Sequence, residues 1–277
     1  MRLSTTMRSA AAVAALALTA TACAGTAAAF ESLADAGEGQ IGVQSSTTGE
    51  SFATDNAPDT ATIVAFEDAG TLFTALQAGT VDAVLQDLPV NAEFARNNEG
   101  FSVVEEFETG ESYGFAVAEE GAENLLVAVN AALGELKGDG FYDAVFTKYF
   151  GTAASDADTE LPTVEAGTSD GVELITAGTL TVCSDLPYPP FEFEDADAPS
   201  GYSGFDIDLV QAISTKLGLE LAVIVSGFDP IQSGIAMATG QCDLAASAMT
   251  ITEEREANLD FTDGYYDAKQ SLLVANA

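Results

Sequence analysis

The sequence predicts an α/β protein in which strands alternate with helices and form mostly parallel sheets with flanking helices. Short apolar runs of strand length are followed by segments with helical spacing, and this alternation occurs twice along the chain. Residues 152–171 have little periodicity and separate the two series. Because 47% of the 277 residues are apolar, the chain can bury a sizeable core in one large or two small domains.

The first series contains three strands and the helices that follow them. Its predicted elements are a strand over 40–44, a helix over 50–56, a strand over 61–66, a helix over 68–78, a strand over 81–85 and a helix start at Asp87-Leu88-Pro89. Leu72, Phe73 and Leu76 give the helix over 68–78 its apolar face, and Gly79 ends it. Pro89 suits the first turn of the third helix.

Two helices and a linker connect the series. An amphipathic helix over 123–136 places Leu126, Val129 and Leu133 on one face, and a second helix covers 142–150. Residues 152–171 are mainly Ala, Ser, Thr, Asp, Glu and Gly, which predicts a flexible acidic linker.

The second series repeats the pattern after the linker. Its predicted elements are strands over 179–183, 219–225, 244–248 and 270–274 and helices over 205–217 and 229–239. Gly218 and Gly240 end the two helices.

The composition excludes several classes of function. The chain has 44 acidic and 8 basic residues, and a net charge of −36 repels nucleic acid and anionic membrane surfaces. It contains no histidine, which removes Ser-His-Asp and Cys-His catalysis and histidine metal sites. These absences favour a binding protein without cofactor or metal over an enzyme.

The first 29 residues are predicted to be a targeting segment. Arg2 and Arg8 precede an apolar run over 10–22 that is too short to span a bilayer, so residues 1–22 are interpreted as a signal peptide. Ala20-Thr21-Ala22-Cys23 resembles a lipobox, which predicts lipidation of Cys23 and a tether over 23–29. Ordinary cleavage near residues 27–29 is the alternative.

Two further cysteines, Cys183 and Cys242, remain after the leader. Extracellular cysteines can form a disulfide. Each lies in or beside an apolar strand-like run, which is an equally suitable place for a buried free thiol. A disulfide and two free thiols are both compatible with the sequence.

Four stretches of the chain together resemble the polar amino-acid family of periplasmic-type solute-binding proteins. They are LTVCSDLPYPPFEF with GFDIDL (180–193 and 204–209), AMTITEER with DFT and YY (248–255, 260–262 and 265–266), IGVQSSTTGE (41–50) and VDAVLQD (81–87). The resemblance covers 32–151 and 177–277, and four matches in one chain are more specific than any one of them.

The resemblance implies the two-lobe periplasmic-binding-protein type II fold, known as the Venus-flytrap fold. In the family the segment like 179–276 comes first, so this chain resembles a circular permutation in which residues 152–171 join the former ends. The small lobe is then expected over 30–112 and the large lobe over 113–277. On this division only the connection near Tyr113 joins the lobes covalently.

The resemblance also assigns residues to the two charged groups of an amino acid. Arg255, Thr250 and Thr48 are expected to hold the carboxylate, because a guanidinium binds a carboxylate through two parallel bonds. Asp87 is expected to hold the ammonium, with the carbonyl of Ala248 and the hydroxyl of Thr250.

The ligand side chain is expected between aromatic walls. Tyr188 and Phe228 match the wall positions of the family, and Asp185 ends a strand beside them. Gln44 and Gln86 can hydrogen-bond either kind of charge. A carboxylate at Asp185 favours a basic amino acid, with glutamine or another neutral polar amino acid as the alternative.

The predicted function is that of a monomeric, extracytoplasmic, membrane-anchored lipoprotein that captures a polar, basic L-amino acid and delivers it to an ABC-transporter permease. The permease partner is implied by the resemblance alone. A dehydratase-like enzyme on the same fold, with Asp185 or Glu192 as its acid, and a ligand sensor are the alternatives from other classes.

Overall fold

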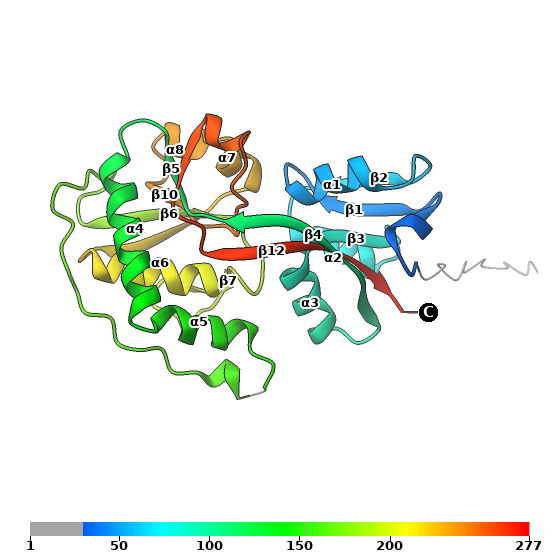
Figure 1. Ribbon diagram of the computed structural model, residues 1–277, viewed down its shortest axis with the longest axis horizontal. Helices are drawn as coiled ribbons and strands as arrows, with labels where there is room; N and C mark the ends of the chain where they lie inside the picture. The colour runs from blue at the N-terminus through cyan, green and yellow to red at the C-terminus, as the bar shows by residue number, and fades with distance from the viewer. Residues whose placement is uncertain (1–29, 154, 277) are drawn as a thin grey trace, which may run out of the picture.

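The computed structural model describes residues 30–153 and 155–276, which form two α/β lobes side by side (Figure 1). The predicted signal peptide, Cys23 and the tether lie outside the described residues. Within the described ranges, no helix is both long enough and apolar enough to cross a membrane. The predicted α/β class with mostly parallel strands is confirmed.

The first lobe is a five-stranded sheet with the order β2-β1-β3-β12-β4. Its elements are η1 (Leu33–Ala36), β1 (Gln40–Gln44), α1 (Thr48–Asn56), β2 (Thr62–Phe66), α2 (Ala69–Gln77), β3 (Ala83–Asp87), α3 (Leu88–Asn97), β4 (Phe101–Tyr113) and β12 (Tyr266–Ala275). β1, β2 and β3 are parallel. The side chains of Thr47 and Asp68 accept hydrogen bonds from the first turns of α1 and α2, which fixes where these helices begin.

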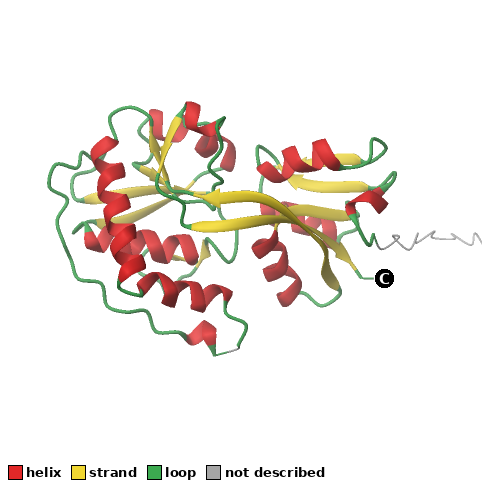
Figure 2. Cartoon of the chain, viewed as in Figure 1, coloured by secondary structure: helices red, strands yellow, loops and turns green. Residues whose placement is uncertain are grey.

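The second lobe has a sheet with the order β11-β5-β10-β6-β9 and a short β7–β8 hairpin (Figure 2). Its elements are β5 (Ala116–Ala118), α4 (Glu123–Gly138), α5 (Phe141–Phe150), η2 (Asp156–Asp158), β6 (Thr179–Ser184), β7 (Phe193–Glu194), β8 (Tyr202–Ser203), α6 (Phe205–Lys216), β9 (Glu220–Val225), α7 (Phe228–Gln232), α8 (Ile235–Ala238), β10 (Leu244–Ala245), η3 (Arg255–Ala257) and β11 (Leu259–Phe261). The predicted helix over 229–239 is two helices, because Gly234 adopts a φ of 79° between them.

The last strand differs from the sequence prediction. β12 pairs antiparallel with β3 and β4, so residues 266–275 belong to the first sheet rather than to the large lobe. From here on, the small lobe is residues 30–112 with 266–275, and the large lobe is residues 113–265.

Two neighbouring segments cross between the lobes. The chain passes from β4 to β5 at 113–116 and returns from β11 to β12 at 261–266. The backbone N–H of Tyr265 donates to the carbonyl of Tyr113 at 2.8 Å, and that of Thr262 donates to Phe115 at 2.9 Å. The prediction of a single covalent connection is therefore wrong, and the lobes share a two-stranded hinge.

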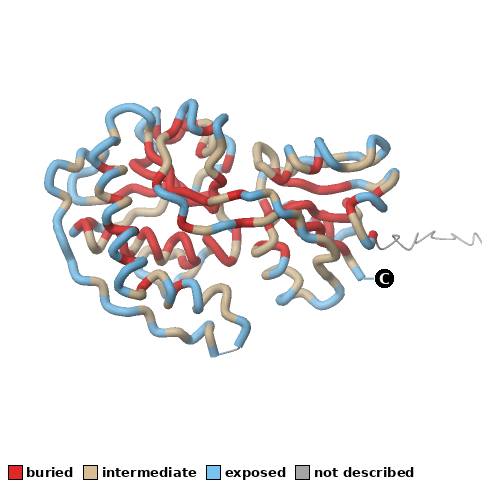
Figure 3. The backbone as a smooth tube through the Cα atoms, in the orientation of Figure 1, coloured by how far each residue is buried: buried red, intermediate tan, exposed pale blue. Residues whose placement is uncertain are grey.

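The linker over 152–171 lies along the outside of the large lobe, where it is largely exposed (Figure 3). Leu161 and Val164 nevertheless pack against the main hydrophobic core. The backbone N–H of Gly167 also donates to the carbonyl of Thr215 at the end of α6. This segment, called the strap below, is thus docked on the large lobe, whereas its composition predicts a flexible linker.

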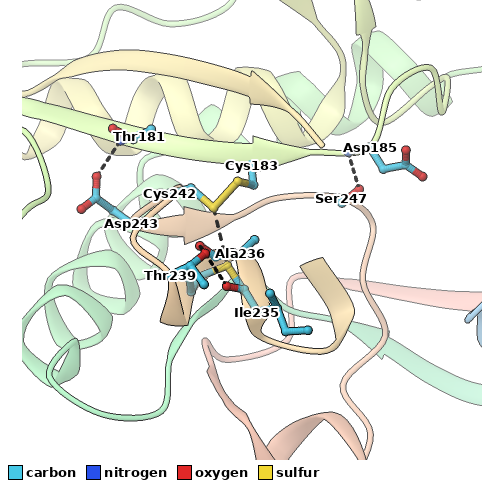
Figure 4. Close-up of a disulfide and its surroundings, with 10 residues drawn as sticks. Thr181, Cys183, Asp185, Ile235, Ala236, Thr239, Cys242, Asp243 and Ser247 are labelled. Atoms are coloured by element: carbon cyan, nitrogen blue, oxygen red, sulfur yellow. Dashed lines mark hydrogen bonds between the residues drawn. A yellow bond between two sulfur atoms is a disulfide. The ribbon is translucent and has the colours of Figure 1, made fainter. Parts of the chain in front are cut away.

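A disulfide joins Cys183 on β6 to Cys242 before β10 (Figure 4). Both cysteines are buried in a core cluster that also contains Met237 and Met249. The disulfide alternative of the sequence prediction is the one that the structure shows. Because the bridge lies close to β10 and the loop after it, it helps to anchor the segment that carries Ala248 and Thr250.

Candidate functional site

A small cavity lies between the lobes. Its lining residues are Gln44, Thr47, Thr48, Asp87, Asp185, Tyr188, Phe228, Ser247, Ala248, Thr250 and Arg255. Nine of the ten predicted ligand-binding residues are in this set, and the structure therefore brings them together. Gln86 is the exception: it is buried in β3, where successive side chains point to opposite faces, so its neighbour Asp87 reaches the cavity instead.

Arg255 supplies the positive charge of the cavity. Its side chain is 5% exposed, and its Nη1 and Nη2 atoms donate to the carbonyls of Thr250 at 2.7 Å and Ser46 at 3.2 Å. The guanidinium lies 5.1 Å from the centre of the Phe228 ring. Among the described residues, no carboxylate lies within 4.0 Å of it. A buried guanidinium without an acidic partner is suited to an incoming carboxylate.

Asp87 ends β3 and is held by donors from both lobes. Its Oδ2 accepts hydrogen bonds from the hydroxyls of Tyr113 and Tyr188, each at 2.6 Å, and its Oδ1 accepts one from the amide of Gln270. It makes no side-chain capping bond to α3. Burial, followed by the charge of Glu111, raises the pKa of Asp87 to about 6. Burial therefore destabilises the ionised form of Asp87, and a nearby cation would stabilise it.

Asp185 follows β6, and Figure 4 shows its side chain directed away from the disulfide. Its Oδ2 accepts a hydrogen bond of 2.6 Å from the Gln44 amide, and its backbone N–H donates to Ser247 at 3.0 Å. Burial raises the pKa of Asp185 to about 7, against the opposing effect of Gln44. This carboxylate also lacks a cationic partner among the described residues.

Two aromatic side chains enclose the space between these charges. Tyr188 lies in the proline-rich loop after β6, and its hydroxyl bond to Asp87 fixes the ring against the small lobe. Phe228 begins α7 and lies against Arg255. Both rings line the cavity, which is where the sequence placed the aromatic walls.

Ala248 shapes the floor of the cavity through its backbone. It has a φ of 43°, a left-handed conformation that alanine adopts rarely, and β10 has already ended at Ala245. Its N–H donates to Asp206 at 2.8 Å, and Ser247 donates to Glu192 at 2.9 Å. Buried carboxylates of the large lobe therefore hold both residues in place.

Four residues at or beside the cavity were not among the predicted site residues. Thr47 and Ser247 line the cavity, and each is adjacent to a predicted site residue. Glu111 and Gln270 lie beside Asp87, on β4 and β12. Glu111 is one of 44 acidic residues, and only the pairing of β4 with β12 brings it to the site.

Contacts between the lobes close the cavity on several sides. Gln44 of the small lobe bonds Asp185 of the large lobe, and the hydroxyl of Ser46 donates to Asp229 at 3.0 Å. Arg255 donates across the same gap to Ser46. The structure therefore consists of two lobes on a two-stranded hinge, closed over a small charged cavity, an arrangement that can enclose a small ligand between the lobes.

Comparison with known proteins finds relatives of the second series of elements. Residues 180–277 match the family model of the bacterial extracellular solute-binding proteins, family 3. The chain is 32% identical over 108 residues to an arginine-binding extracellular protein of Bacillus subtilis, covering 39% of this chain and 38% of that protein. It is 38% identical over 90 residues to an arginine-binding protein of Corynebacterium glutamicum, covering 32% and 28%.

An enzyme is also similar to this chain. Cyclohexadienyl dehydratase of Pseudomonas aeruginosa is 28% identical over 104 residues, which cover 37% of each chain. The chain thus spans less than two fifths of the length of each of these three relatives.

Proposed function

We propose that this protein captures a basic L-amino acid in the cavity between its lobes. The observation that carries the proposal is the arrangement of charge. Among the described residues, the buried guanidinium of Arg255 has no carboxylate within 4.0 Å, and Asp87 and Asp185 line the same cavity without a lysine or arginine at that distance. A ligand with one carboxylate and two cationic groups satisfies all three. Arg255 binds the α-carboxylate, Asp87 the α-ammonium and Asp185 the cationic end of the side chain.

The balance of charge favours a basic ligand over a neutral one. Asp87, Asp185 and the adjoining Glu111 bring three negative charges near the cavity, and Arg255 brings one positive charge. A zwitterionic ligand leaves this excess unchanged, whereas a basic amino acid lowers it by one. Buried charges are costly unless they are paired, so the basic ligand removes more of the desolvation cost. Tyr188 and Phe228 add aromatic faces that attract a cation.

The names of two relatives support the proposed ligand. Two matched proteins are named as arginine-binding, which fits the charge of the cavity. We place the protein outside the cytoplasm, as a monomer anchored through a lipid on Cys23, with an ABC-transporter permease as the partner that receives the ligand. The enzyme alternative draws support from the dehydratase relative, and turnover of a bound ligand is the readout that would favour it.

We also propose that the chain is a circular permutation of the family order. Phe30 and Val274, near the two ends of the described chain, belong to one core cluster of the small lobe, so these ends can be rejoined. The strap over 152–171 connects α5 to the segment before β6. A rearranged chain with 177–276 first, a short Gly/Ser connection and then 30–151 should fold and bind the same ligand. Failure to bind, with the original chain active, would contradict the permutation.

A thermal-shift panel tests the ligand. The protein without residues 1–23 is heated with each amino acid, ornithine and citrulline. A ligand at 100 times its Kd stabilises the folded state by about 2.7 kcal/mol, which is a clear rise in Tm. We expect arginine, lysine or ornithine to give the largest rise. A rise with glutamine or citrulline alone would make Asp185 an amide acceptor, and no rise with any amino acid would refute the proposed function.

A further inference from the structure

Glu111 binds the hydroxyls of two cavity residues with one oxygen. Its Oε2 accepts a hydrogen bond of 2.7 Å from Thr48 and another of 2.7 Å from Thr250. Glu111 is on β4 and Thr48 begins α1, both in the small lobe, whereas Thr250 belongs to the large lobe. Glu111 is only 8% exposed and is not among the cavity-lining residues. It therefore acts on the cavity through the two threonines.

The chemistry of a hydroxyl fixes what these threonines offer to a ligand. A threonine hydroxyl has one proton and two lone pairs, and a carboxylate only accepts hydrogen bonds. Because Thr48 and Thr250 both give their protons to Glu111, their oxygens are left as acceptors. An acceptor cannot bind a carboxylate oxygen, but it binds an ammonium group, which is a donor only.

Gln270 joins Glu111 to the second carboxylate of the group. Its amide nitrogen donates to Glu111 Oε1 at 3.1 Å and also to Asp87. Its own Oε1 has no partner in the described part of the chain. Two buried carboxylates thus share one neutral amide, and no lysine or arginine of the described residues lies within 4.0 Å of either.

We propose that Glu111 is a positioning residue that turns the hydroxyls of Thr48 and Thr250 into acceptors and so makes the space beside Asp87 a subsite for a primary ammonium group. This inference rests on the proposed function. It keeps the Thr250 hydroxyl at the ammonium and adds that of Thr48, while the ligand carboxylate is left to Arg255 and to backbone N–H groups. The ammonium then donates hydrogen bonds to the hydroxyl oxygens of Thr48 and Thr250 and to the carboxylate of Asp87.

Three ligands separate the ammonium from the carboxylate. L-arginine has both groups, agmatine keeps an ammonium but lacks the carboxylate, and 5-guanidinopentanoate keeps the carboxylate but lacks the ammonium. Their affinities are measured by calorimetry on the wild-type protein, on Glu111→Gln and on Glu108→Gln. Glu108 is the matched control, because it lies on the same strand and loses the same charge while its side chain is 79% exposed.

The amide in Glu111→Gln donates to one threonine and frees the proton of that hydroxyl to point elsewhere. We expect arginine and agmatine to bind about 10- to 100-fold more weakly, the range for hydrogen bonds to a charged group. The affinity for 5-guanidinopentanoate should change less than about 3-fold, and Glu108→Gln should leave all three unchanged. An equal loss for all three ligands would show a structural role and overturn the proposal.

Thr48→Val is the second variant if Glu111→Gln does not fold. It removes one hydroxyl and leaves Glu111 in place, so arginine and agmatine should weaken while 5-guanidinopentanoate does not. If 5-guanidinopentanoate weakens as much as arginine, the hydroxyl binds the carboxylate and the proposal is wrong. A wild-type protein that binds no amino acid overturns the proposed function and this inference together. A wild-type protein that binds arginine, with variants that do not discriminate, overturns this inference alone.

Discussion

Buried acids occur in two groups around the cavity, and the two groups differ in what can neutralise them. The cavity acids are Asp87, Glu111 and Asp185, which accept hydrogen bonds from residues of both lobes. The floor pair is Glu192 and Asp206, which lies wholly in the large lobe with both side chains fully buried. Asp87 and Asp185 line a space that a ligand can enter, and Glu111 contacts the cavity residues Thr48 and Thr250. The floor pair does not line this space.

The floor pair has the features of two carboxyl groups that hold a proton. Glu192 Oε2 and Asp206 Oδ1 have no partner among the described residues, although Ser247, Ala248 and Tyr265 donate to their other oxygens. Burial and then the charge of Asp206 raise the pKa of Glu192 well above its usual range, and burial raises the pKa of Asp206 to about 7. The comparison indicates that a bound proton lowers the charge of the floor pair, while the charge of the cavity acids is balanced by the cations of the ligand.

The largest expected effect on ligand affinity comes from removing the cation opposite the cavity acids. Arg255→Ala should weaken arginine binding about 100- to 1,000-fold, because one partner of a buried charge pair is removed. Calorimetry measures the change. Arg96→Ala is the control, since that arginine is exposed and pairs with Glu93 outside the cavity. Wild-type affinity in Arg255→Ala would refute the site.

The next effect separates Asp185 from the other cavity acids. Asp185→Asn keeps the shape of the side chain and removes its charge, so arginine should bind about 10- to 100-fold more weakly. Citrulline has a neutral end of nearly the same shape, and its affinity should change little. The ratio of the two dissociation constants is the readout. An unchanged ratio would place the cationic end of the ligand elsewhere.

The pH dependence of binding tests whether the cavity acids must be ionised. Burial raises the pKa of Asp185 to about 7 and that of Asp87 to about 6, and a bound cation lowers both pKa values. Protons are therefore released on binding, and the Kd for arginine should rise about 10- to 100-fold from pH 8 to pH 5. Calorimetry in buffers of different ionisation enthalpy counts the protons. Tighter binding at pH 5 would contradict this account.

The smallest effect concerns the stability of the empty protein. Carboxyl groups whose pKa is raised by folding bind more protons in the folded state between about pH 4 and 7, so stability falls as pH rises through this range. Calorimetric Tm values should be higher at pH 5 than at pH 8. Glu192→Gln should flatten this slope by up to about 1.4 kcal/mol per pH unit, while Glu194→Gln, an exposed neighbour, should not.

Bound arginine separates the contributions of the two groups of acids to the pH dependence of stability. Saturating arginine should remove the part of the pH slope that comes from Asp87 and Asp185. The part that comes from Glu192 and Asp206 should remain, because the ligand does not reach that pair. A slope that disappears completely with arginine would show that the floor pair also responds to the cavity.

The sequence predicts the fold where periodicity and end signals agree. β1 matches its predicted bounds, and α2, α4, α5 and β6 differ by two residues or fewer at each end. β4 was not predicted, because Glu105, Glu106 and Glu108 give it a polar composition that is unusual for a strand. Its structure comes from pairing with β12, a contact between segments about 160 residues apart.

The cavity residues were predictable from the resemblance, whereas their partners were not. Arg255 and Asp87 lie in stretches that resemble the family. Glu111 and Gln270 come from two strands that only tertiary pairing places together, and no local pattern marks either residue. The hinge was mispredicted for the same reason: β12 pairs with the small lobe although it follows the large lobe in sequence.

A crystal structure of the protein with L-arginine tests how the cavity orients its ligand. We expect the α-carboxylate on Arg255, the α-ammonium between Asp87 and the hydroxyls of Thr48 and Thr250, and the guanidinium at Asp185. A ligand bound in the opposite direction, with its guanidinium at Asp87, or an arginine that occupies a place outside the cavity, would contradict it.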